Sequence, residues 1–390
     1  MDFDLSPEDE AFREEFRAWL AEHRPPEVDV AANFEEAETL RGWQRTLASG
    51  RWVGIHWPER YGGRGASLVQ VAIYNEELAR AQAPQILGRA GVNLVGPTLI
   101  AHGTERQREE WLPRILSAEL IWSQLFSEPG AGSDLAGLST RAEKRGDTYV
   151  VTGQKVWTSY AKFADYGIAL VRTDPDAPKH RGISMLAIPL QADGVDVRPL
   201  RQITGESEFN EVFLDGVEVP AENLIGEENA GWAVAGTTLA NERGTSFVWK
   251  EQVLHEVARD LLWKRALADG LDTDPLARQR LAQTWMDVEI FRLHNARTLT
   301  RLARGEPIGP ESSLVKLFWT GMSQHLYETA GELLGSDALR WADDPRTVDG
   351  GRWARGLLWS RAASIAGGTS EIQKGIIGER ILGLPREPKP

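Results

Sequence analysis

The hydrophobic pattern of this chain changes its period twice, and this constrains the fold more than any other feature. Up to about residue 120, apolar residues such as Phe12, Phe16 and Leu20 recur at helical spacing. From about residue 121 the pattern becomes a series of short β-rich runs, such as TYVVTGQKVWTS at 148–159. After residue 228 helical spacing returns in long segments. The sequence therefore predicts an α+β protein with three domains: a helical domain at 1–120, a β domain at 121–228 and a helical domain at 229–390.

The size and charge of the chain exclude several classes of function. A chain of 390 residues is longer than one hydrophobic core usually supports, which agrees with several domains. Its 44 Lys and Arg against 57 Asp and Glu give a net charge of −13, which argues against general binding to nucleic acid or to an anionic membrane. No cysteine is present and the His spacing indicates no metal site, so redox chemistry would require a bound cofactor. We expect a soluble cytoplasmic protein, because no apolar run approaches the ~20 residues that span a bilayer.

Two glycine-rich turns are the strongest candidates for a binding site. The first, SEPGAGSD, offers hydroxyls and unhindered backbone N–H groups that can hydrogen-bond the polar edge of a flat ring system. The second, AGGTSEIQ, places Gly367 and Gly368 just before a predicted helix, which lets a phosphate, a carbonyl group or a cofactor approach the backbone. A structural interpretation is also available, because Ser370 and Gln373 have the spacing of a capping box. Taken alone, the turns leave both interpretations open.

Two motifs together, LFSEPGAGSD at 125–134 and GQKVWTS at 153–159, resemble the acyl-CoA dehydrogenase family. The resemblance covers almost the whole chain and includes WPERYGG, GWAVAGTTLANER and GGTSEIQ. It implies an N-terminal all-α domain, a middle β-barrel-like domain and a C-terminal four-helix bundle, with FAD and an acyl-CoA thioester between them. The implied reaction is FAD-dependent α,β-dehydrogenation of the thioester to the trans-2-enoyl-CoA, by abstraction of the α-proton and transfer of the β-hydride to flavin N5.

The resemblance assigns the cofactor contacts to these turns and to the strand between them. Ser127 matches the family serine whose hydroxyl meets the flavin ring, and Trp157 matches the aromatic residue along one face of that ring. A single Trp is more often a core residue, and this chain has 15. The implied FAD contacts are Gln124, Phe126, Ser127, Gly132, Ser133, Trp157, Thr158, Ser159, Thr369 and Glu371. The implied substrate contacts are Ser133, Arg243, Ala366 and Gly368.

The catalytic base is not where the medium-chain branch of the family carries it. That branch has a glutamate at the position of Gly367, and Glu371 lies in the predicted first helical turn, where it suits the helix dipole. The isovaleryl- and long-chain-type branch carries a Glu followed by Arg on a bundle helix, which matches Glu242 and Arg243. Without the resemblance, this pair would be interpreted as surface charges. We therefore expect Glu242 to abstract the α-proton, and the Gly367 N–H to bind the thioester carbonyl in an oxyanion hole.

Two segments that bind the ADP half of a neighbouring subunit's FAD in homotetrameric members are altered here. In place of Arg-x-x-Phe-Gly the chain has Arg278 and Arg280 without Phe-Gly, and Glu332 stands at the Gln position of Gln-x-x-Gly-Gly. The resemblance implies a homodimer or homotetramer. The altered segments also allow an α2β2 heterotetramer, as in actinobacterial dehydrogenases of sterol side-chain breakdown.

Two alternatives to a catalytic dehydrogenase remain. A non-catalytic partner subunit that completes the site of another chain would explain the altered ADP segments, whereas Glu242 and the SEPGAGSD turn favour catalysis. A flavin monooxygenase relative would not need the base. For a catalytic chain, the resemblance implies an acyl-CoA substrate and an electron-transfer flavoprotein or similar electron acceptor. The sequence does not indicate whether the acyl group is straight, branched, aromatic or sterol-derived.

Overall fold

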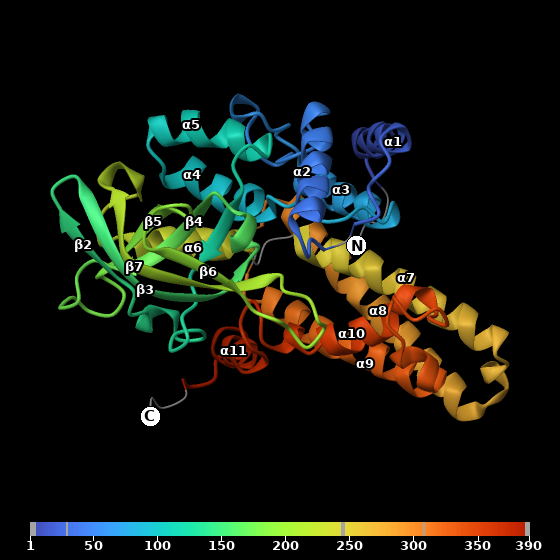
Figure 1. The fold of residues 1–390 in the computed structure, drawn as a ribbon. Coiled ribbons are helices and arrows are strands. Elements are labelled where there is room, and N and C mark those ends of the chain that lie inside the picture. Colours follow the sequence, from blue (N-terminus) through green and yellow to red (C-terminus); the bar gives the residue numbers. More distant parts are fainter. Residues whose placement is uncertain (1–4, 29, 243–245, 307–308, 387–390) are drawn as a thin grey trace. The chain divides into compact units, whose positions relative to one another are not determined.

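The computed structural model describes residues 5–28, 30–242, 246–306 and 309–386, and the chain divides into two compact units (Figure 1). The sheet unit consists of Glu15–Ser67 and Ala81–Gly244. The bundle unit consists of Met1–Glu14, Leu68–Arg80 and Thr245–Pro390. Each unit is thus assembled from segments that are far apart in the sequence.

Helices form the first part of the chain, as the apolar spacing predicts. They are α1 (Pro7–Glu22), α2 (Phe34–Ser49), α3 (Leu68–Arg80), α4 (Gly96–His102) and α5 (Glu105–Leu116). Helix α1 begins at Pro7 because the Ser6 hydroxyl caps it, accepting a hydrogen bond of 3.1 Å from the Asp9 N–H. Within the sheet unit, Phe16 packs on Trp52 with ring centroids 4.4 Å apart.

The eight strands of the described residues belong to one sheet in the sheet unit. They are β1 (Trp122–Leu125), β2 (Arg141–Arg145), β3 (Thr148–Ser159), β4 (Tyr166–Arg172), β5 (Ile183–Pro189), β6 (Val195–Pro199), β7 (Phe209–Pro220) and β8 (Leu224–Ile225). Their order is β6-β7-β3-β2-β4-β5-β8, and β1 pairs in parallel with β4. The predicted strand at 148–159 is confirmed with the same bounds. The sequence pattern missed β1, β2 and β8. Strands β1 and β8 have four and two residues, too few to show alternation, and four of the five residues of β2 are charged.

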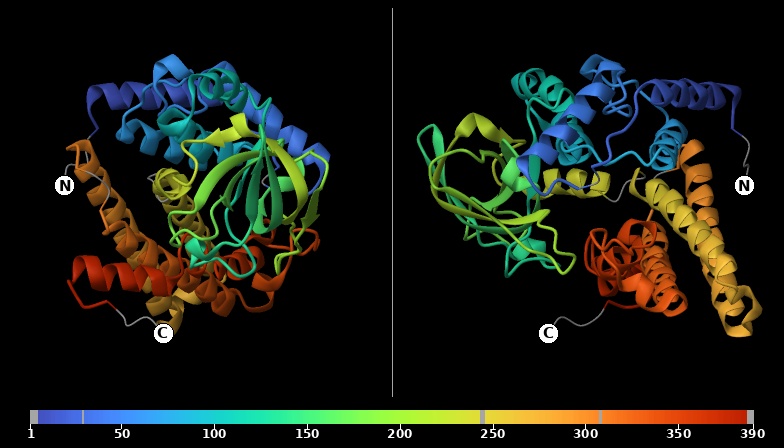
Figure 2. Two further views of the ribbon diagram at one scale, coloured as in Figure 1. Left: turned by 90° about the vertical axis from the view of Figure 1, so that its left-hand side faces the viewer. Right: turned by 45° about the vertical axis from the view of Figure 1, so that its right-hand side comes forward.

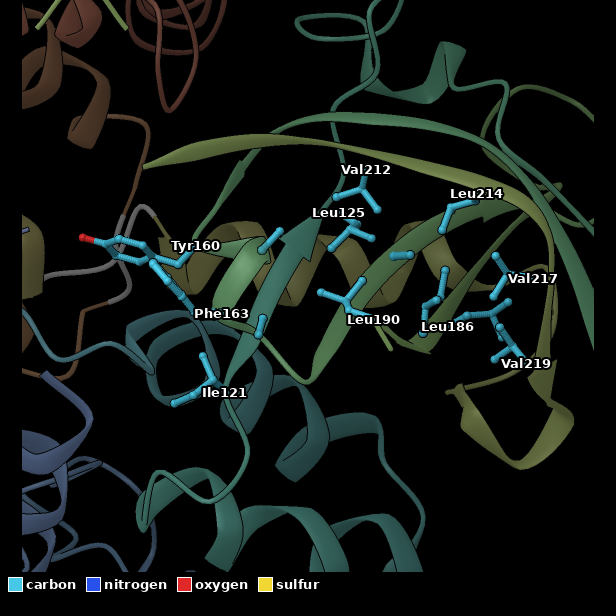
Figure 3. Packing of buried hydrophobic residues seen from close by; sticks show 14 of the residues in the cluster. Ile121, Leu125, Tyr160, Phe163, Leu186, Leu190, Val212, Leu214, Val217 and Val219 are labelled. Atoms are coloured by element: carbon cyan, nitrogen blue, oxygen red, sulfur yellow. The ribbon is translucent and has the colours of Figure 1, made fainter. Parts of the chain in front are cut away.

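The apolar core of the sheet unit lies between the strands, where side chains from distant parts of the chain meet (Figure 3). Leu125 of β1, Leu186 of β5 and Val212 of β7 are completely buried in this cluster. Tyr160 and Phe163, just after β3, belong to the same cluster. Because the residues at the end of β1 and after β3 are fixed in this core, the turns that follow them start from rigid positions.

The bundle unit is built from long helices. They are α7 (Ser246–Ala268), α8 (Pro275–Ala303), α9 (Ser312–Leu334), α10 (Arg352–Trp359) and α11 (Ser370–Ile376), together with α3. Figure 2 shows α7 and α8 running alongside each other. Gly270 and Gly305 follow α7 and α8 with left-handed φ angles of 69° and 75°, a conformation that ends a helix and that glycine adopts readily. The buried faces of α7, α8 and α9 share one core, to which Leu262, Phe291 and Trp319 contribute.

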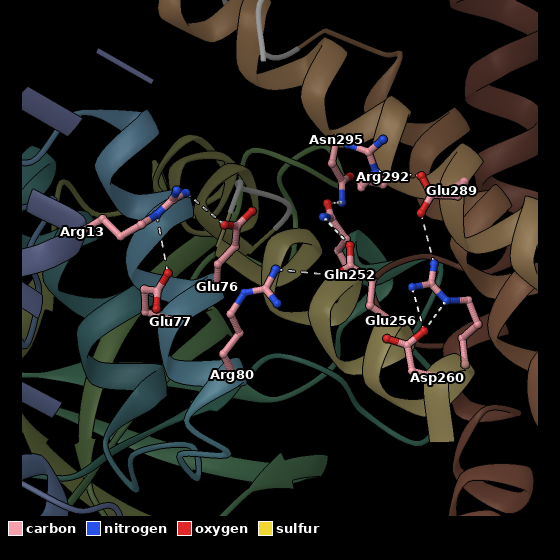
Figure 4. A network of polar contacts seen from close by, with 11 residues as sticks. Arg13, Glu76, Glu77, Arg80, Gln252, Glu256, Asp260, Glu289, Arg292 and Asn295 are labelled. Carbon is pink, nitrogen blue, oxygen red and sulfur yellow. Dashed lines mark hydrogen bonds and ion pairs between the residues drawn. The ribbon is translucent and has the colours of Figure 1, made fainter. Parts of the chain in front are cut away.

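Helix α3 joins the bundle through ion pairs and one apolar contact, although its sequence places it among the N-terminal helices (Figure 4). Arg13 lies 3.5 Å from both Glu76 and Glu77 of α3. Arg80 of α3 lies 3.6 Å from Glu256 of α7, and Ala72 belongs to a small buried cluster with residues of α7 and α8. The compact units therefore follow these contacts, whereas the predicted domain boundaries follow the order of helices and strands.

Within the described residues, no helix combines the length and the apolar character that crossing a membrane requires.

Candidate active site

The turn after β1 is tied to β3 by Lys155, whose side chain is completely buried. Lys155 Nζ lies 2.8 Å from Glu128 Oε1 and donates hydrogen bonds to the carbonyls of Phe126 (3.2 Å) and Leu170 (2.7 Å). Its three N–H donors are thus all used. A second link is the hydrogen bond of 2.9 Å from the Val156 N–H to the Ser127 carbonyl. These bonds fix the backbone on both sides of Ser127, the residue predicted to contact the flavin ring.

Glu128, the partner of Lys155, organises the far side of the same turn. Its carboxylate accepts hydrogen bonds from the N–H groups of Ser139 (2.6 Å) and Thr140 (2.9 Å). Burial pushes the pKa of Glu128 upwards, but the Lys155 ammonium and these hydrogen bonds outweigh it and bring the pKa to about 2. Burial lowers the pKa of Lys155 to about 8, against the opposing effect of Glu128. Both groups are charged at neutral pH. This ion pair was not predicted from the sequence, although Glu128 lies in the LFSEPGAGSD motif and Lys155 lies in the GQKVWTS motif.

Trp157 presents its indole to solvent from the middle of this supported region. Its side chain is 61% exposed and its φ is 60°, a left-handed value that is unusual for a bulky residue. The pairing of β3 with β7 shifts register between Lys155 and Thr158, and this irregularity turns the indole outwards while Lys155 stays buried. The Phe209 ring packs against the indole nearly at right angles, with a centroid distance of 5.9 Å. A large aromatic face is therefore held open at a strained position, which is a feature of binding sites.

The other predicted flavin contacts of the sheet unit fall into an accessible and a buried set. Ser133 and Gly132 are exposed, and the accessible set also includes the half-buried Gln124, Ser127 and Ser159. Phe126 and Thr158 are buried. The hydroxyl of Thr158 has no hydrogen-bond partner among the described residues.

The second glycine turn lies in the bundle unit, and the predicted capping box there is wrong. Thr369, not Ser370, is the N-cap of α11, and its hydroxyl accepts a hydrogen bond of 3.3 Å from the Ile372 N–H. The Gln373 side chain does not reach the N-cap N–H and instead donates to the carbonyls of Gly367 (3.1 Å) and Gly368 (3.3 Å). The reason is the left-handed φ of both glycines, 64° and 93°, which turns the chain into the helix one residue earlier.

Three further predicted residues of this turn are accessible. Ala366 and Gly367 are exposed, and a Cβ added to Gly367 would meet no atom within 4 Å, so the space beside it is open. Glu371 is exposed in the first turn of α11.

The predicted base, Glu242, is the last residue of α6 (Gly231–Glu242). Its side chain is not among the described atoms, and Arg243 lies outside the described residues. Helix α6 itself is firmly placed in the sheet unit: Thr98 Oγ1 of α4 lies 2.9 Å from Thr238 Oγ1, and His102 Nε2 lies 2.7 Å from Thr237 Oγ1.

Comparison with known proteins assigns the chain to a family. Three domain families match it: the acyl-CoA dehydrogenase N-terminal domain at residues 6–119, the middle domain at 123–217 and the C-terminal domain at 229–382. Acyl-CoA dehydrogenase IpdE1 of Mycobacterium tuberculosis is 39% identical over 389 residues, which cover 97% of this chain and 99% of that protein. The chain belongs to the acyl-CoA dehydrogenase family. The predicted family, fold and enzyme class are therefore confirmed.

Solved structures of acyl-CoA dehydrogenases agree over the full length. The ChsE4-ChsE5 complex from Mycobacterium tuberculosis matches with a TM-score of 0.87 and 33% identity, covering 99% of this chain and 100% of that one. The Tcur3481-Tcur3483 steroid acyl-CoA dehydrogenase matches with a TM-score of 0.88 and 31% identity, with the same coverage. Acyl-CoA dehydrogenase FadE34 of Mycobacterium tuberculosis is 38% identical, and the match covers 94% of this chain but 50% of that protein.

Members of the acyl-CoA dehydrogenase family generally bind FAD, and the residues of the sheet unit fit such a group. The exposed Trp157 indole offers a platform for a flat ring, and the half-buried Ser127 is held beside this segment by the hydrogen bond of its carbonyl to the Val156 N–H. Thr158 directly follows Trp157, and its hydroxyl has no hydrogen-bond partner within the described part of the chain. A Cβ added to Gly132 would meet nothing within 4 Å, so the backbone of the turn is open to a ligand.

Proposed function

We propose that this acyl-CoA dehydrogenase is catalytic and converts an acyl-CoA thioester to the trans-2-enoyl-CoA. The observation that carries the proposal is the exposed, left-handed Trp157 beside a turn that the Glu128–Lys155 pair holds in place. FAD, when bound, supplies the acceptor for the β-hydride at flavin N5. The FAD contacts of this proposal are Gln124, Phe126, Ser127, Gly132, Ser133, Trp157, Thr158, Ser159, Thr369 and Glu371.

The proton chemistry is assigned to two residues of the chain itself. Glu242 takes the proton from the α-carbon, and the Gly367 N–H stabilises the negative charge that develops on the thioester oxygen. The position of Gly367, exposed and left-handed with open space beside it, supports this assignment, because no side chain blocks the backbone. The proposed substrate contacts are Ser133, Arg243, Ala366 and Gly368.

The test is an absorbance spectrum of the purified protein, followed by anaerobic titration with acyl-CoA thioesters. We expect a yellow protein whose flavin absorbance bleaches with at least one of them. Because the relatives include a steroid acyl-CoA dehydrogenase, the panel should contain straight-chain, branched, aromatic and steroid-derived acyl groups. A colourless protein that FAD does not reconstitute would reject catalysis and favour the partner-subunit alternative.

Trp157→Ala is expected to weaken FAD binding without destabilising the fold. An aromatic stacking contact is typically worth about 0.5–1.5 kcal/mol, so the FAD dissociation constant should rise about two- to tenfold. The melting temperature of the apoprotein should stay close to that of the wild type, because the indole is 61% exposed. Fluorescence titration of the apoprotein with FAD measures the effect, and Trp341→Ala, which removes another partly exposed indole, is the control. Equal FAD affinity in Trp157→Ala and the wild type would contradict the assignment.

We also propose that a partner of different sequence holds the ADP half of FAD, in an α2β2 assembly. Arg280 and Glu332 stand at positions that contact ADP in homotetrameric members, and here they pair with each other at 2.8 Å. Because each side chain partly neutralises the charge of the other, less charge is available to bind the ADP half of a neighbouring subunit's FAD. One solved relative, the ChsE4-ChsE5 complex, contains two different chains, which supports such an assembly. The same ion pair is the observation that favours the non-catalytic partner subunit as a second candidate.

The surface of α7 and α8 supports an oligomer. Trp263, Ala282, Trp285 and Met286 line an open, mostly apolar hollow of about 450 Å³ in the bundle unit. Met286 is 49% exposed and Trp285 is 41% exposed. Clustered exposed apolar side chains of this kind mark interaction sites.

Met286→Glu is therefore expected to weaken the assembly, because it would bury a charge in an apolar interface. Light scattering at micromolar concentration should show a dimer or tetramer for the wild type and a smaller mass for the variant. Gln279→Glu adds the same charge at an exposed position of α8 and should leave the mass unchanged. A wild-type monomer with FAD bound would show that the proposed assembly is wrong.

Two further assignments complete the proposal. An electron-transfer flavoprotein or a similar protein accepts the electrons, and the reaction takes place in the cytoplasm as a step of fatty acid or sterol side-chain β-oxidation. The proposed domain boundaries are 1–120, 121–228 and 229–390.

A further inference from the structure

Lys316 of α9 ties together the two ends of the second glycine turn. Its Nζ donates hydrogen bonds to the carbonyls of Ala363 (2.7 Å) and Gly368 (2.9 Å). The side chain is half-buried, and burial lowers its pKa against the opposing effect of Glu371. Residues 364–367 lie between the two acceptors. One ammonium group therefore closes the loop that contains Gly367.

Two neighbouring side chains donate to the same two carbonyls and to the carbonyl of Gly367. Thr320 Oγ1 donates to the Ala363 carbonyl at 3.1 Å, and Gln373 Nε2 donates to the Gly367 and Gly368 carbonyls at 3.1 and 3.3 Å. In a trans peptide the N–H points opposite to the C=O of the preceding residue. The Gly368 N–H therefore points away from Gln373, and the Thr369 N–H points away from both Lys316 and Gln373. The Gly367 N–H lies in the loop that Lys316 closes.

These backbone donors are free to bind a ligand. Among the described residues, no hydrogen bond is found from the N–H groups of Gly367, Gly368 or Thr369. Glycine has little conformational preference of its own, so a turn with φ angles of 64° and 93° at two successive glycines needs outside contacts to hold it. Lys316 supplies the only cation among those contacts in the described part of the loop, and hydrogen bonds from a charged donor are about twice as strong as neutral ones.

We propose that Lys316 is a positioning residue for the reaction: by joining Ala363 to Gly368 it closes the loop of residues 364–367 and holds the Gly367 N–H where it meets the thioester oxygen as negative charge develops there. This inference rests on the proposed function of Gly367. Lys316 does not itself touch the substrate in this scheme. It acts through the turn, because an oxyanion donor is effective only when it is oriented before the charge appears.

The test compares Lys316→Met with Lys374→Met, which removes the same charge from an exposed position of α11. Misplacing a catalytic donor costs up to about 10²-fold, so flavin reduction in Lys316→Met should slow about 10- to 100-fold with little change in KM. A 3-thia-acyl-CoA loses its α-proton without transferring hydride, and the resulting anion beside oxidised flavin gives a long-wavelength absorbance. This absorbance should be weaker in Lys316→Met than in the wild type. Lys374→Met should behave as the wild type in both measurements.

Amide hydrogen exchange of the peptide covering residues 363–369 gives a readout that is independent of turnover. Exchange should be faster in Lys316→Met than in the wild type. Lys316→Arg can still donate to two carbonyls, so it should restore at least part of the exchange protection and of the rate of flavin reduction. Unchanged exchange or an unchanged reduction rate in Lys316→Met would overturn the proposal. If Lys316→Met does not fold, Lys316→Gln, which removes the charge and shortens the side chain, decides instead. Faster exchange and a slower rate are expected in this variant, and undisturbed exchange and rate would overturn the proposal. If no thioester reduces the flavin of the wild-type protein, the proposed function is rejected. The exchange comparison would still test whether Lys316 holds the glycine turn.

Discussion

Glu242→Gln should abolish dehydrogenation and leave the flavin in place. Gln keeps the size of the side chain and removes its basicity. The position that carries the base in the medium-chain branch is Gly367, so no carboxylate there can take over. General-base catalysis is typically worth about 10²–10⁴-fold, and the rate of flavin bleaching in stopped-flow should fall by at least that factor. The flavin absorbance of the purified variant should match that of the wild type.

Glu371→Gln is the matched control, because it removes a carboxylate from the exposed first turn of α11. This change should alter FAD affinity or the helix start and leave bleaching by bound substrate largely intact. The opposite pattern, in which bleaching survives in Glu242→Gln and disappears in Glu371→Gln, would assign the base to the glycine turn after all.

Lys155→Met should strongly destabilise the sheet unit and lower its FAD content. The substitution leaves the Glu128 carboxylate buried without its cation, and breaking a buried ion pair from one side typically costs about 3–5 kcal/mol. Urea unfolding of the FAD-free protein measures the loss of unfolding free energy. Lys144→Met is the control, because the Lys144–Glu228 pair of 3.2 Å is solvent-exposed and should be worth less than about 1 kcal/mol.

The double variant Lys155→Met with Glu128→Gln should regain part of the lost stability, since Gln places no charge in the core. Equal urea midpoints for Lys155→Met and the wild type would mean that the pair does not hold the turn.

The pH dependence of stability follows from the same pair. The pKa of Glu128 is about 2 in the folded protein against 4.5 when unperturbed. The unfolded chain therefore binds the proton more readily, and the contribution of Glu128 is complete above about pH 4.5 and is lost as the pH falls towards 2. Unfolding free energies at pH 5 and pH 3 should differ less in Glu128→Gln than in the wild type.

The sequence alone determined the order of helices and strands and the family. The strand at 148–159 was predicted with its observed bounds because twelve residues of β-rich sequence end at turns on both sides. The start of α1 is likewise a local feature, because Ser6 and Pro7 act on the first turn through local hydrogen bonding and a fixed φ. The family was predicted because its motifs are contiguous. All these signals lie within a few residues of the feature that they specify.

Only the tertiary structure decided which segments share a core and how the turns are held. Helix α3 joins the bundle through Arg13 and Glu256, which are distant from it in the sequence. Lys155 reaches Glu128 across 27 positions, and Lys316 reaches Gly368 across 52. A local pattern does not specify such partners. Every Lys could pair with any carboxylate or carbonyl group of the chain, and only the fold brings one particular pair together. The capping box at Ser370 failed for the same reason: the left-handed glycines, held by Lys316 and Gln373 from outside the turn, moved the helix start by one residue.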